Sequence, residues 1–204
     1  MIGFYNYTVI LTYLGLLSGF GGILCASSGN LKAALLLLLV AGLCDMFDGL
    51  VASTMKRTKS EKRFGIQIDS LSDLICFGVL PAVICFYCTN ERVFHGIIPG
   101  LYLLCALIRL AWFNVDEEDR QDKQVGSRKH YLGLPVTTSA LIVPFFVGLG
   151  ELLSLPLDHV TSWLLLVVAI AFITPFRMKK AGCYGKLGMI AGGIATLLLV
   201  IFGV

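Results

Sequence analysis

The 204-residue sequence predicts an all-α fold in which six to seven helices cross a membrane. Hydrophobic residues make up 57% of the chain and charged residues 14%, and the mean hydropathy is +0.85, a balance far too apolar for an ordinary soluble domain. Apolar stretches long enough to cross about 30 Å of hydrocarbon recur along the whole chain. We therefore expect residues 1–204 to form a single polytopic membrane domain.

The expected spans follow the apolar stretches in order. The N-terminal segment, Met1 to Tyr7, has no Lys or Arg, so it lacks the basic region of a cleaved signal peptide, and we expect the first span to be retained. The last span decides between six helices and seven. The spans are residues 5–26, 31–52, 66–89, 96–114, 132–150, 159–176 and 187–204.

The basic residues set the orientation of these spans, because Lys and Arg in short loops are retained on the cytoplasmic side. Of the 16 basic residues, 13 lie in the loops after the second, fourth and sixth spans, and only Lys32, Arg92 and Arg109 lie elsewhere. We therefore expect these loops and the N-terminus in the cytoplasm. The formal net charge of +3 then reflects membrane orientation and indicates no nucleic-acid partner.

Two other segments have structural interpretations. In the first span, Gly15 with Gly19 and Ser18 with Gly22 have the four-residue spacing that lets membrane helices approach closely. The segment from Asp116 to His130 mixes acidic and basic residues, and it is expected to be a solvated cytoplasmic loop.

Four aspartates lie inside the second and third spans. An ionised Asp at the centre of a bilayer costs about 2.5–3.5 kcal/mol on insertion scales, so each one needs compensation. Asp45 and Asp48 are three residues apart, and Asp69 and Asp73 are four apart, so each pair lies on one face of its helix. Because the two helices are consecutive and antiparallel, we expect all four carboxylates to converge just inside the cytoplasmic end.

A divalent cation would relieve the repulsion among converging carboxylates. Carboxylate oxygens without Cys or His favour Mg²⁺, Mn²⁺ or Ca²⁺ over zinc. Paired intramembrane aspartates also serve in ion transport or helix packing, and these residues alone leave both interpretations open. Small residues beside the carboxylates, Gly49, Ala52 and Gly65, would leave space for a phosphate ligand, which the basic loop would attract.

The spacing of these residues resembles the signature of the CDP-alcohol phosphotransferase family, D-x2-D-G-x2-A-R-x8-G-x3-D-x3-D. Seven of its eight fixed positions agree. Ser53 stands in place of the motif arginine, and 11 residues rather than eight separate it from the motif glycine. The matching residues are Asp45, Asp48, Gly49, Ala52, Gly65, Asp69 and Asp73.

Within that family, the chain is similar to the integral-membrane phosphatidylserine synthases. The stretch from Leu71 to Ala82 resembles their D-S-x-x-D-x-x-x-F-G-V-x-P-A run, Arg109 to Asn114 resembles R-L-A-R-F-N, and Gly133 to Pro135 matches G-L-P. Trp112 replaces the second arginine of R-L-A-R, so two arginines of the family pattern are absent, counting the one at Ser53.

The resemblance implies an enzyme that transfers a phosphatidyl group from CDP-diacylglycerol to the hydroxyl of L-serine, with CMP as leaving group. It implies that Asp45, Asp48 and Asp69, with Asp73 contributing, hold one or two Mg²⁺ or Mn²⁺ ions, and that Asp73 is the general base. Either Lys56 or Arg57 would then supply the missing arginine charge. Contacts to CDP and its phosphates are expected from Asp48, Gly49, Ala52, Lys56, Arg57 and Gly65.

Arg109 is the only basic residue deep within an expected span, which makes it a functional candidate. Its guanidinium would suit a serine carboxylate or a substrate phosphate, and a salt bridge to one of the aspartates is the alternative. The sequence leaves both open.

Other functions are compatible with the same aspartates. The nearest rival is the same chemistry with glycerol phosphate or inositol phosphate as acceptor, and a non-catalytic family member is another. A divalent-cation transporter would carry ionisable groups at more than one depth, whereas these four cluster at one end. We expect an integral protein of the cell membrane, surrounded by membrane lipids and with its active site facing the cytoplasm. A homodimer is left open.

Overall fold

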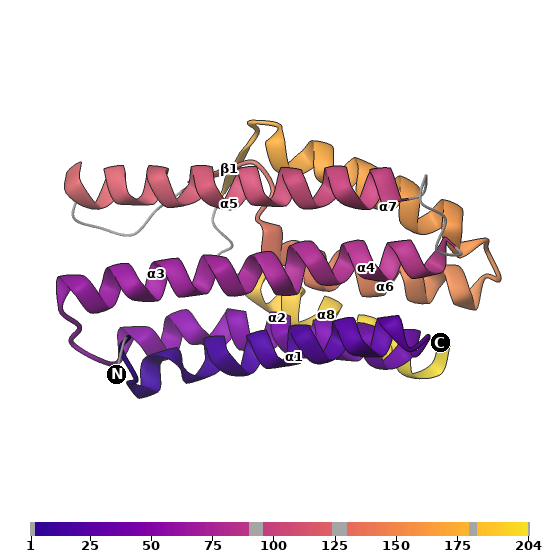
Figure 1. Cartoon of the computed structure of the whole chain (residues 1–204), viewed down its shortest axis with the longest axis horizontal. Coiled ribbons are helices and arrows are strands. Elements are labelled where there is room, and N and C mark those ends of the chain that lie inside the picture. The colour runs from indigo at the N-terminus through magenta and orange to yellow at the C-terminus, as the bar shows by residue number, and fades with distance from the viewer. Residues whose placement is uncertain (1–2, 90–95, 124–129, 180–182, 204) are drawn as a thin grey trace.

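The computed structural model describes residues 3–89, 96–123, 130–179 and 183–203, which form a bundle of long helices running alongside one another (Figure 1). Its most deeply buried side chains, each at most 1% exposed, include Leu38, Leu80, Tyr102, Val143 and Leu165. In chain order the elements are η1 (Tyr7–Val9), α1 (Ile10–Ser27), α2 (Leu31–Ser53), α3 (Lys59–Asp73), η2 (Leu74–Val79), α4 (Leu80–Cys88), α5 (Ile97–Lys123), β1 (His130–Leu132), η4 (Val136–Thr138), α6 (Ser139–Leu152), α7 (Leu157–Ile173), β2 (Arg177–Lys179) and α8 (Cys183–Gly203).

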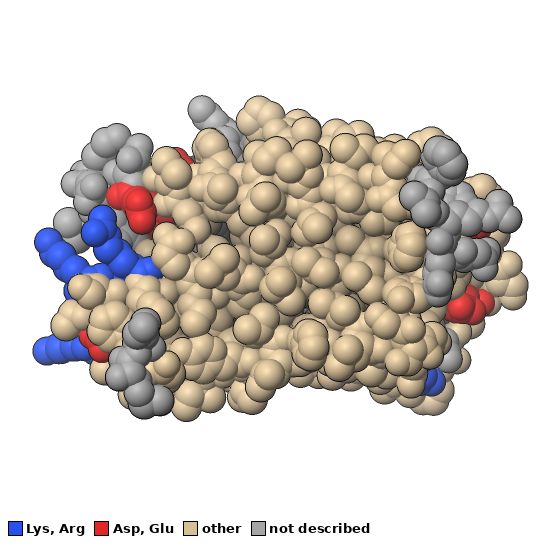
Figure 2. Space-filling model, in the orientation of Figure 1, with Lys and Arg blue, Asp and Glu red and all other residues tan. Residues whose placement is uncertain are grey.

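The helices confirm the predicted fold class. Four are long and apolar enough to cross a membrane, and three shorter apolar helices follow them in the described part of the chain. Figure 2 shows Lys and Arg gathered at the end of the bundle where α3 begins, whereas the broad middle of this face has neither acidic nor basic residues. The four long spans are Tyr7–Ser27, Leu31–Ser53, Lys59–Cys88 and Ile97–Glu118, and the shorter helices are Val136–Leu152, Leu157–Ile173 and Ile190–Gly203.

Small residues let α1 pack closely on its neighbours, as predicted. A Cβ atom added at Gly19 would lie 2.5 Å from Cys76 Sγ and 3.1 Å from Cys76 Cα, and one added at Gly22 would lie 2.7 Å from Leu80 Cδ2. Ser18, directly before Gly19, donates a hydrogen bond from its hydroxyl to the Leu37 carbonyl at 2.8 Å. The N-terminal helix therefore contacts both α2 and the helix that carries Asp69 and Asp73.

The third span begins seven residues earlier than the predicted boundary at residue 66, because a capping box starts α3 in the polar loop. The Thr58 side chain accepts a hydrogen bond from the Glu61 backbone N–H, and the Glu61 carboxylate accepts one from the Thr58 backbone N–H at 2.8 Å. The helix then continues without a break from Lys59 to Cys88. The first two turns of α3 are largely polar, and they precede the apolar part of the helix that the sequence predicted.

Directly after Asp73, this continuous helix has a π-helical segment, η2. Pro81 has no N–H to donate to the carbonyl four residues before it, that of Phe77. Two buried hydroxyls from later in the chain donate to this carbonyl, Tyr102 Oη at 2.6 Å and Ser139 Oγ at 3.2 Å. Side chains of α5 and α6 thus satisfy a carbonyl beside the proline.

Two features of the second half differ from the sequence prediction. The expected loop from Asp116 to His130 is helical as far as Lys123, because its Glu, Gln, Arg and Lys residues favour a helix and simply lengthen α5. In addition, β1 pairs antiparallel with β2, so that Tyr131 lies opposite Met178. This three-residue ribbon was not predicted, since neither segment has an alternating pattern long enough to indicate a strand.

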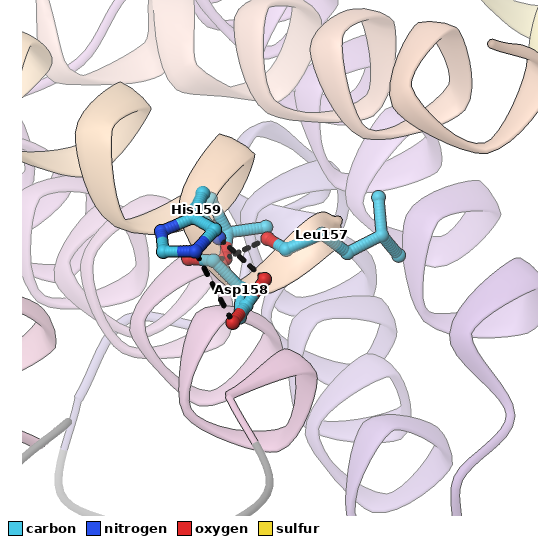
Figure 3. A network of polar contacts seen from close by, with 4 residues as sticks. Leu157, Asp158 and His159 are labelled. Carbon is cyan, nitrogen blue, oxygen red and sulfur yellow. Dashed lines mark hydrogen bonds and ion pairs between the residues drawn. The ribbon is translucent and has the colours of Figure 1, made fainter. Parts of the chain in front are cut away.

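The first turn of α7 contains a surface contact of Asp158 with His159 (Figure 3). Asp158 Oδ1 accepts a hydrogen bond from the His159 backbone N–H at 2.8 Å, and Asp158 Oδ2 lies 3.9 Å from His159 Nε2. Both side chains are exposed, and an exposed pair of this kind contributes little to stability. Its place in the first turn of α7 suits the carboxylate, because the N-terminal end of a helix attracts negative charge.

The close packing of α1 predicts that Gly19→Ala lowers the free energy of unfolding by about 1–3 kcal/mol, because the new methyl group would overlap Cys76. Gly21→Ala on the same helix is the matched control, since its Cβ would meet Leu37 at an ordinary 3.5 Å. Unfolding of both variants and the parent in the same detergent would be compared. Equal midpoints for the two variants would contradict the packing.

Candidate active site

Three of the four predicted aspartates meet between α2 and α3. Carboxylate oxygens of Asp45, Asp48 and Asp69 all lie within 4.8 Å of one another, and all three residues are half-buried. Asp45 and Asp48 share one face at the end of α2, and Asp69 projects toward them from the neighbouring antiparallel helix. The predicted convergence is thus observed for these three, and their oxygens could hold a divalent cation.

Asp73 lies one helical turn further along α3 and is 8% exposed. It is outside the group of three oxygens, but it lines a small adjoining hollow together with Asp45, Asp48 and Asp69. So many carboxylates in one buried place repel one another strongly when ionised, and a bound cation would offset that repulsion.

Helix α1 forms part of the site, a contribution that the sequence analysis missed. Thr12 Oγ1 donates a hydrogen bond to Asp48 Oδ2 at 3.3 Å, and Ser72 Oγ donates to the Thr12 carbonyl at 3.4 Å. Thr8 and Thr12 are 3% and 7% exposed and are four residues apart in an otherwise apolar span. That polar pair was the available signal, since buried hydroxyls in a membrane helix need partners.

A second missed residue is Asn114, whose Oδ1 accepts a hydrogen bond from Ser70 Oγ at 2.8 Å. Ser70 directly follows Asp69, so this bond ties the aspartate-bearing stretch of α3 to α5. Side-chain hydrogen bonds between membrane helices fix their relative rotation.

A pocket of about 220 Å³ opens beside the aspartates. Five of the six residues predicted to contact CDP and its phosphates line it, namely Asp48, Gly49, Ala52, Arg57 and Gly65. The sixth, Lys56, is exposed and is absent from its walls. A Cβ at Gly49 would meet no atom within 4 Å, so the backbone there faces open space, as predicted. The remaining lining residues are Thr8, Val9, Thr12, Lys62, Ile66 and Asp69.

Arg57 places a guanidinium in the wall of this pocket. Its Nε is buried and has no hydrogen-bond partner among the described residues. A Cβ at Gly65 would lie 3.1 Å from Arg57 Nη1, so the glycine makes room for the guanidinium. The pocket therefore has carboxylates on its deep side and cationic groups, Arg57 and Lys62, on its wall.

Arg109 lies in a different environment. It is 6% exposed, its Nε donates to the Leu134 carbonyl at 3.1 Å, and its Cζ is 5.4 Å from the centroid of the Trp112 ring. It lines a separate hollow of about 230 Å³, together with Trp112 and the segment from Phe172 to Pro175. Arg109 therefore lines neither of the two pockets that contain the aspartates.

Comparison with known proteins agrees with this geometry. A family model described as CDP-alcohol phosphatidyltransferase matches residues 5–175, which include every aspartate of the cluster. The chain belongs to this family. It is accordingly an integral membrane protein of an enzyme family, and the α8 helix lies beyond the matched region.

Several curated relatives are similar to this family member. Archaetidylserine synthase from Methanothermobacter thermautotrophicus is 31% identical over 177 residues, 86% of this chain and 70% of that protein. CDP-diacylglycerol–serine O-phosphatidyltransferase from Saccharomyces cerevisiae is 37% identical over 107 residues, 52% of this chain and 38% of that protein. The enzyme of the same name from Mycobacterium leprae is 32% identical over 154 residues, 75% of this chain and 48% of that protein. The chain thus spans less than half of the latter two relatives.

The carboxylate cluster predicts that a divalent cation stabilises the folded protein. Mn²⁺ at about 100 times its dissociation constant should raise the free energy of unfolding by about 2.7 kcal/mol. Asp45→Asn should lose most of this effect and should be more stable than the parent in the absence of metal, because one repelling charge is gone. Thermal unfolding in detergent, with and without Mn²⁺, measures both.

Glu151→Gln is the control for this measurement, because Glu151 is exposed in the last turn of α6 and lines neither of the pockets that contain the aspartates. It should keep the full Mn²⁺ effect. An Asp45→Asn variant that responds to Mn²⁺ as strongly as the parent would contradict a cation site at this cluster.

Proposed function

We propose that this chain transfers the phosphatidyl group of CDP-diacylglycerol to the hydroxyl of L-serine, giving phosphatidylserine and CMP. The proposal rests on one observation, that the clustered oxygens of Asp45, Asp48 and Asp69 adjoin a pocket lined by Arg57 and Lys62. Carboxylates and cations in one pocket suit a diphosphate held together with a divalent ion. The names of the relatives, each of which includes serine, support serine as the acceptor.

The proposed cofactor is Mg²⁺ or Mn²⁺, as one or two ions. Asp45, Asp48 and Asp69 would hold it, and Asp73 would contribute from the adjoining hollow. When bound, the ion would supply positive charge against the phosphate oxygens. Oxygen ligands without a Cys or His in the cluster suit these hard cations.

In the proposed reaction, the serine hydroxyl oxygen forms a bond to the phosphorus of the phosphatidyl group, while the bond from that phosphorus to the CMP oxygen breaks. The electron pair of the broken bond stays on CMP, and the hydroxyl proton passes to an Asp73 carboxylate oxygen. The burial of Asp73 beside the other carboxylates supports this role, because a base shielded from water keeps the proton transfer local.

The CDP moiety is proposed to occupy the pocket of about 220 Å³, against Asp48, Gly49, Ala52, Arg57 and Gly65. Lys56, exposed next to Arg57, would add positive charge at the entrance. For Arg109 we retain the proposal of a contact with the serine carboxylate or a substrate phosphate, which would have to reach its separate hollow.

We further propose that the pocket faces the cytoplasm of a cell-membrane protein. The gathering of Lys and Arg at that end of the bundle supports this orientation (Figure 2). Water-soluble serine and CMP would then exchange with the cytoplasm while the acyl chains stay in the lipid. A single domain over residues 1–204 remains a prediction, and a homodimer remains open.

A CMP-release assay tests the function. The purified protein, given CDP-diacylglycerol and Mn²⁺ or Mg²⁺, should release CMP with L-serine and should not do so with glycerol 3-phosphate or inositol phosphate. Asp73→Asn should lower turnover by about 10²–10⁴-fold, because the base is lost. Glu151→Gln, distant from the site, is the matched carboxylate control and should retain activity.

Other outcomes of this assay would favour the rival functions. Release of CMP only with glycerol 3-phosphate would overturn serine as the acceptor. If no acceptor yields CMP, the transferase proposal fails, and Mn²⁺ uptake into liposomes containing the protein would then indicate transport.

The surroundings of Arg109 predict the effect of Arg109→Lys. Lysine keeps the charge but loses the planar group that donates to Leu134 and lies over Trp112, so we expect a rise in the KM for serine of about tenfold. Steady-state kinetics at saturating CDP-diacylglycerol measures this. An unchanged KM with intact turnover would exclude direct recognition of the serine carboxylate by Arg109.

A further inference from the structure

The position of the missing family arginine contributes no charge to the pocket. Ser53 is exposed, and its hydroxyl donates to the Leu50 carbonyl of its own helix at 2.6 Å. It is absent from the pocket walls. Any diphosphate bound there must therefore obtain its guanidinium contact from elsewhere in the chain.

Arg57, four residues further along, reaches the pocket that Ser53 does not. Burying a guanidinium nitrogen without a hydrogen-bond acceptor is costly, and Arg57 Nε is in that state among the described residues. A bound anionic oxygen would remove the cost. The absence of a side chain at Gly65, 3.1 Å from Arg57 Nη1 at the Cβ position, leaves the guanidinium its space.

Contacts from the N-terminal segment hold the loop on both sides of Arg57. Before it, Tyr7 Oη and Thr54 Oγ1 share a hydrogen bond of 3.0 Å. After it, Asn6 Nδ2 donates to Glu61 Oε1 at 3.3 Å, and the same Glu61 carboxylate caps the start of α3. The segment between Ser53 and Gly65, which has 11 residues in place of the eight of the family signature, is therefore held on both sides of Arg57. This restraint lowers the conformational entropy that is lost when Arg57 binds a ligand.

Neighbouring cations have different surroundings. Lys56 is exposed and outside the pocket walls, and Arg63 is likewise exposed and outside them. Lys62 does line the pocket, but its ammonium is a flexible point charge without the fork that matches two phosphate oxygens. Arg57 alone among these four combines a pocket position with a buried, unpartnered guanidinium nitrogen.

We infer that Arg57 replaces the arginine missing at Ser53 as the guanidinium that binds the diphosphate of a cytidine diphosphate ligand. Asn6 and Tyr7 act as positioning residues for it. The inference rests on the proposed function, because the diphosphate is that of CDP-diacylglycerol, but it concerns binding and so has a readout apart from turnover. Charge-assisted, paired hydrogen bonds from one guanidinium suit a diphosphate.

The decisive experiment restores the family arginine. Arg57→Gln should raise the dissociation constant for CDP, measured by calorimetry with Mn²⁺ present, at least about tenfold. It should raise the KM for CDP-diacylglycerol similarly while leaving the KM for serine within about twofold. The double variant Ser53→Arg with Arg57→Gln should recover most of the lost affinity, and Arg63→Gln, an exposed arginine nearby, should behave as the parent.

A second set of variants separates this role from loop folding. Tyr7→Phe should raise the KM for CDP-diacylglycerol about three- to tenfold with kcat unchanged and should leave the thermal midpoint near that of the parent. Asn6→Ala should raise this KM similarly, but it should also lower the thermal midpoint, because the Asn6 side chain caps η1. A dissociation constant unaffected by Arg57→Gln, a larger loss from Lys56→Gln, or failure of Ser53→Arg to restore binding would overturn the inference. Absence of CMP release by the parent would instead overturn the proposed function, while CDP binding would still test Arg57.

Discussion

Repulsion between carboxylates from two neighbouring membrane helices is the constraint on which the rest of this structure depends. Asp45, Asp48 and Asp69 meet within 4.8 Å, a geometry that two free helices would relieve by rotating apart. α1 opposes that rotation, because Gly19 and Gly22 bring it against the long α3–α4 helix while Thr12 donates to Asp48. The first four membrane-spanning helices therefore hold the three carboxylates close together, in an arrangement that a bound cation would stabilise.

The same helices place groups of opposite charge at different positions along the pocket. Asp48 and Asp69 lie within α2 and α3, whereas Arg57 lies in the loop between these helices and Lys62 lies in the first turn of α3. A nucleotide headgroup that entered from the loop end would meet positive charge before it met the acidic cluster. Long-range attraction therefore acts on the ligand before the site that needs a metal ion can repel it.

Much of the fold and of the candidate site could be predicted from the sequence. The spans, their packing glycines and the convergence of Asp45, Asp48 and Asp69 follow from hydropathy and helical spacing, which are local properties. Thr8 and Thr12 could have indicated a buried polar contact, but the hydrogen-bond partners of Thr12 and Asn114 could not be predicted, because each depends on which face of a distant helix turns toward the aspartates. The early start of α3 was overlooked because hydropathy does not detect a capping box. The choice between Lys56 and Arg57 required the depth of each side chain, since their charge and position in the chain are nearly the same.

The carbonyl of Phe77 links the two halves of the chain. It receives hydroxyls from Tyr102 on α5 and from Ser139 on α6, and it lies one turn beyond Asp73. Both hydroxyls come from helices that follow the acidic motif in the chain, so the surroundings of this carbonyl are complete only when α5 and α6 pack against the long helix. The packing of the helix directly after Asp73 therefore depends on residues that lie well past the family signature.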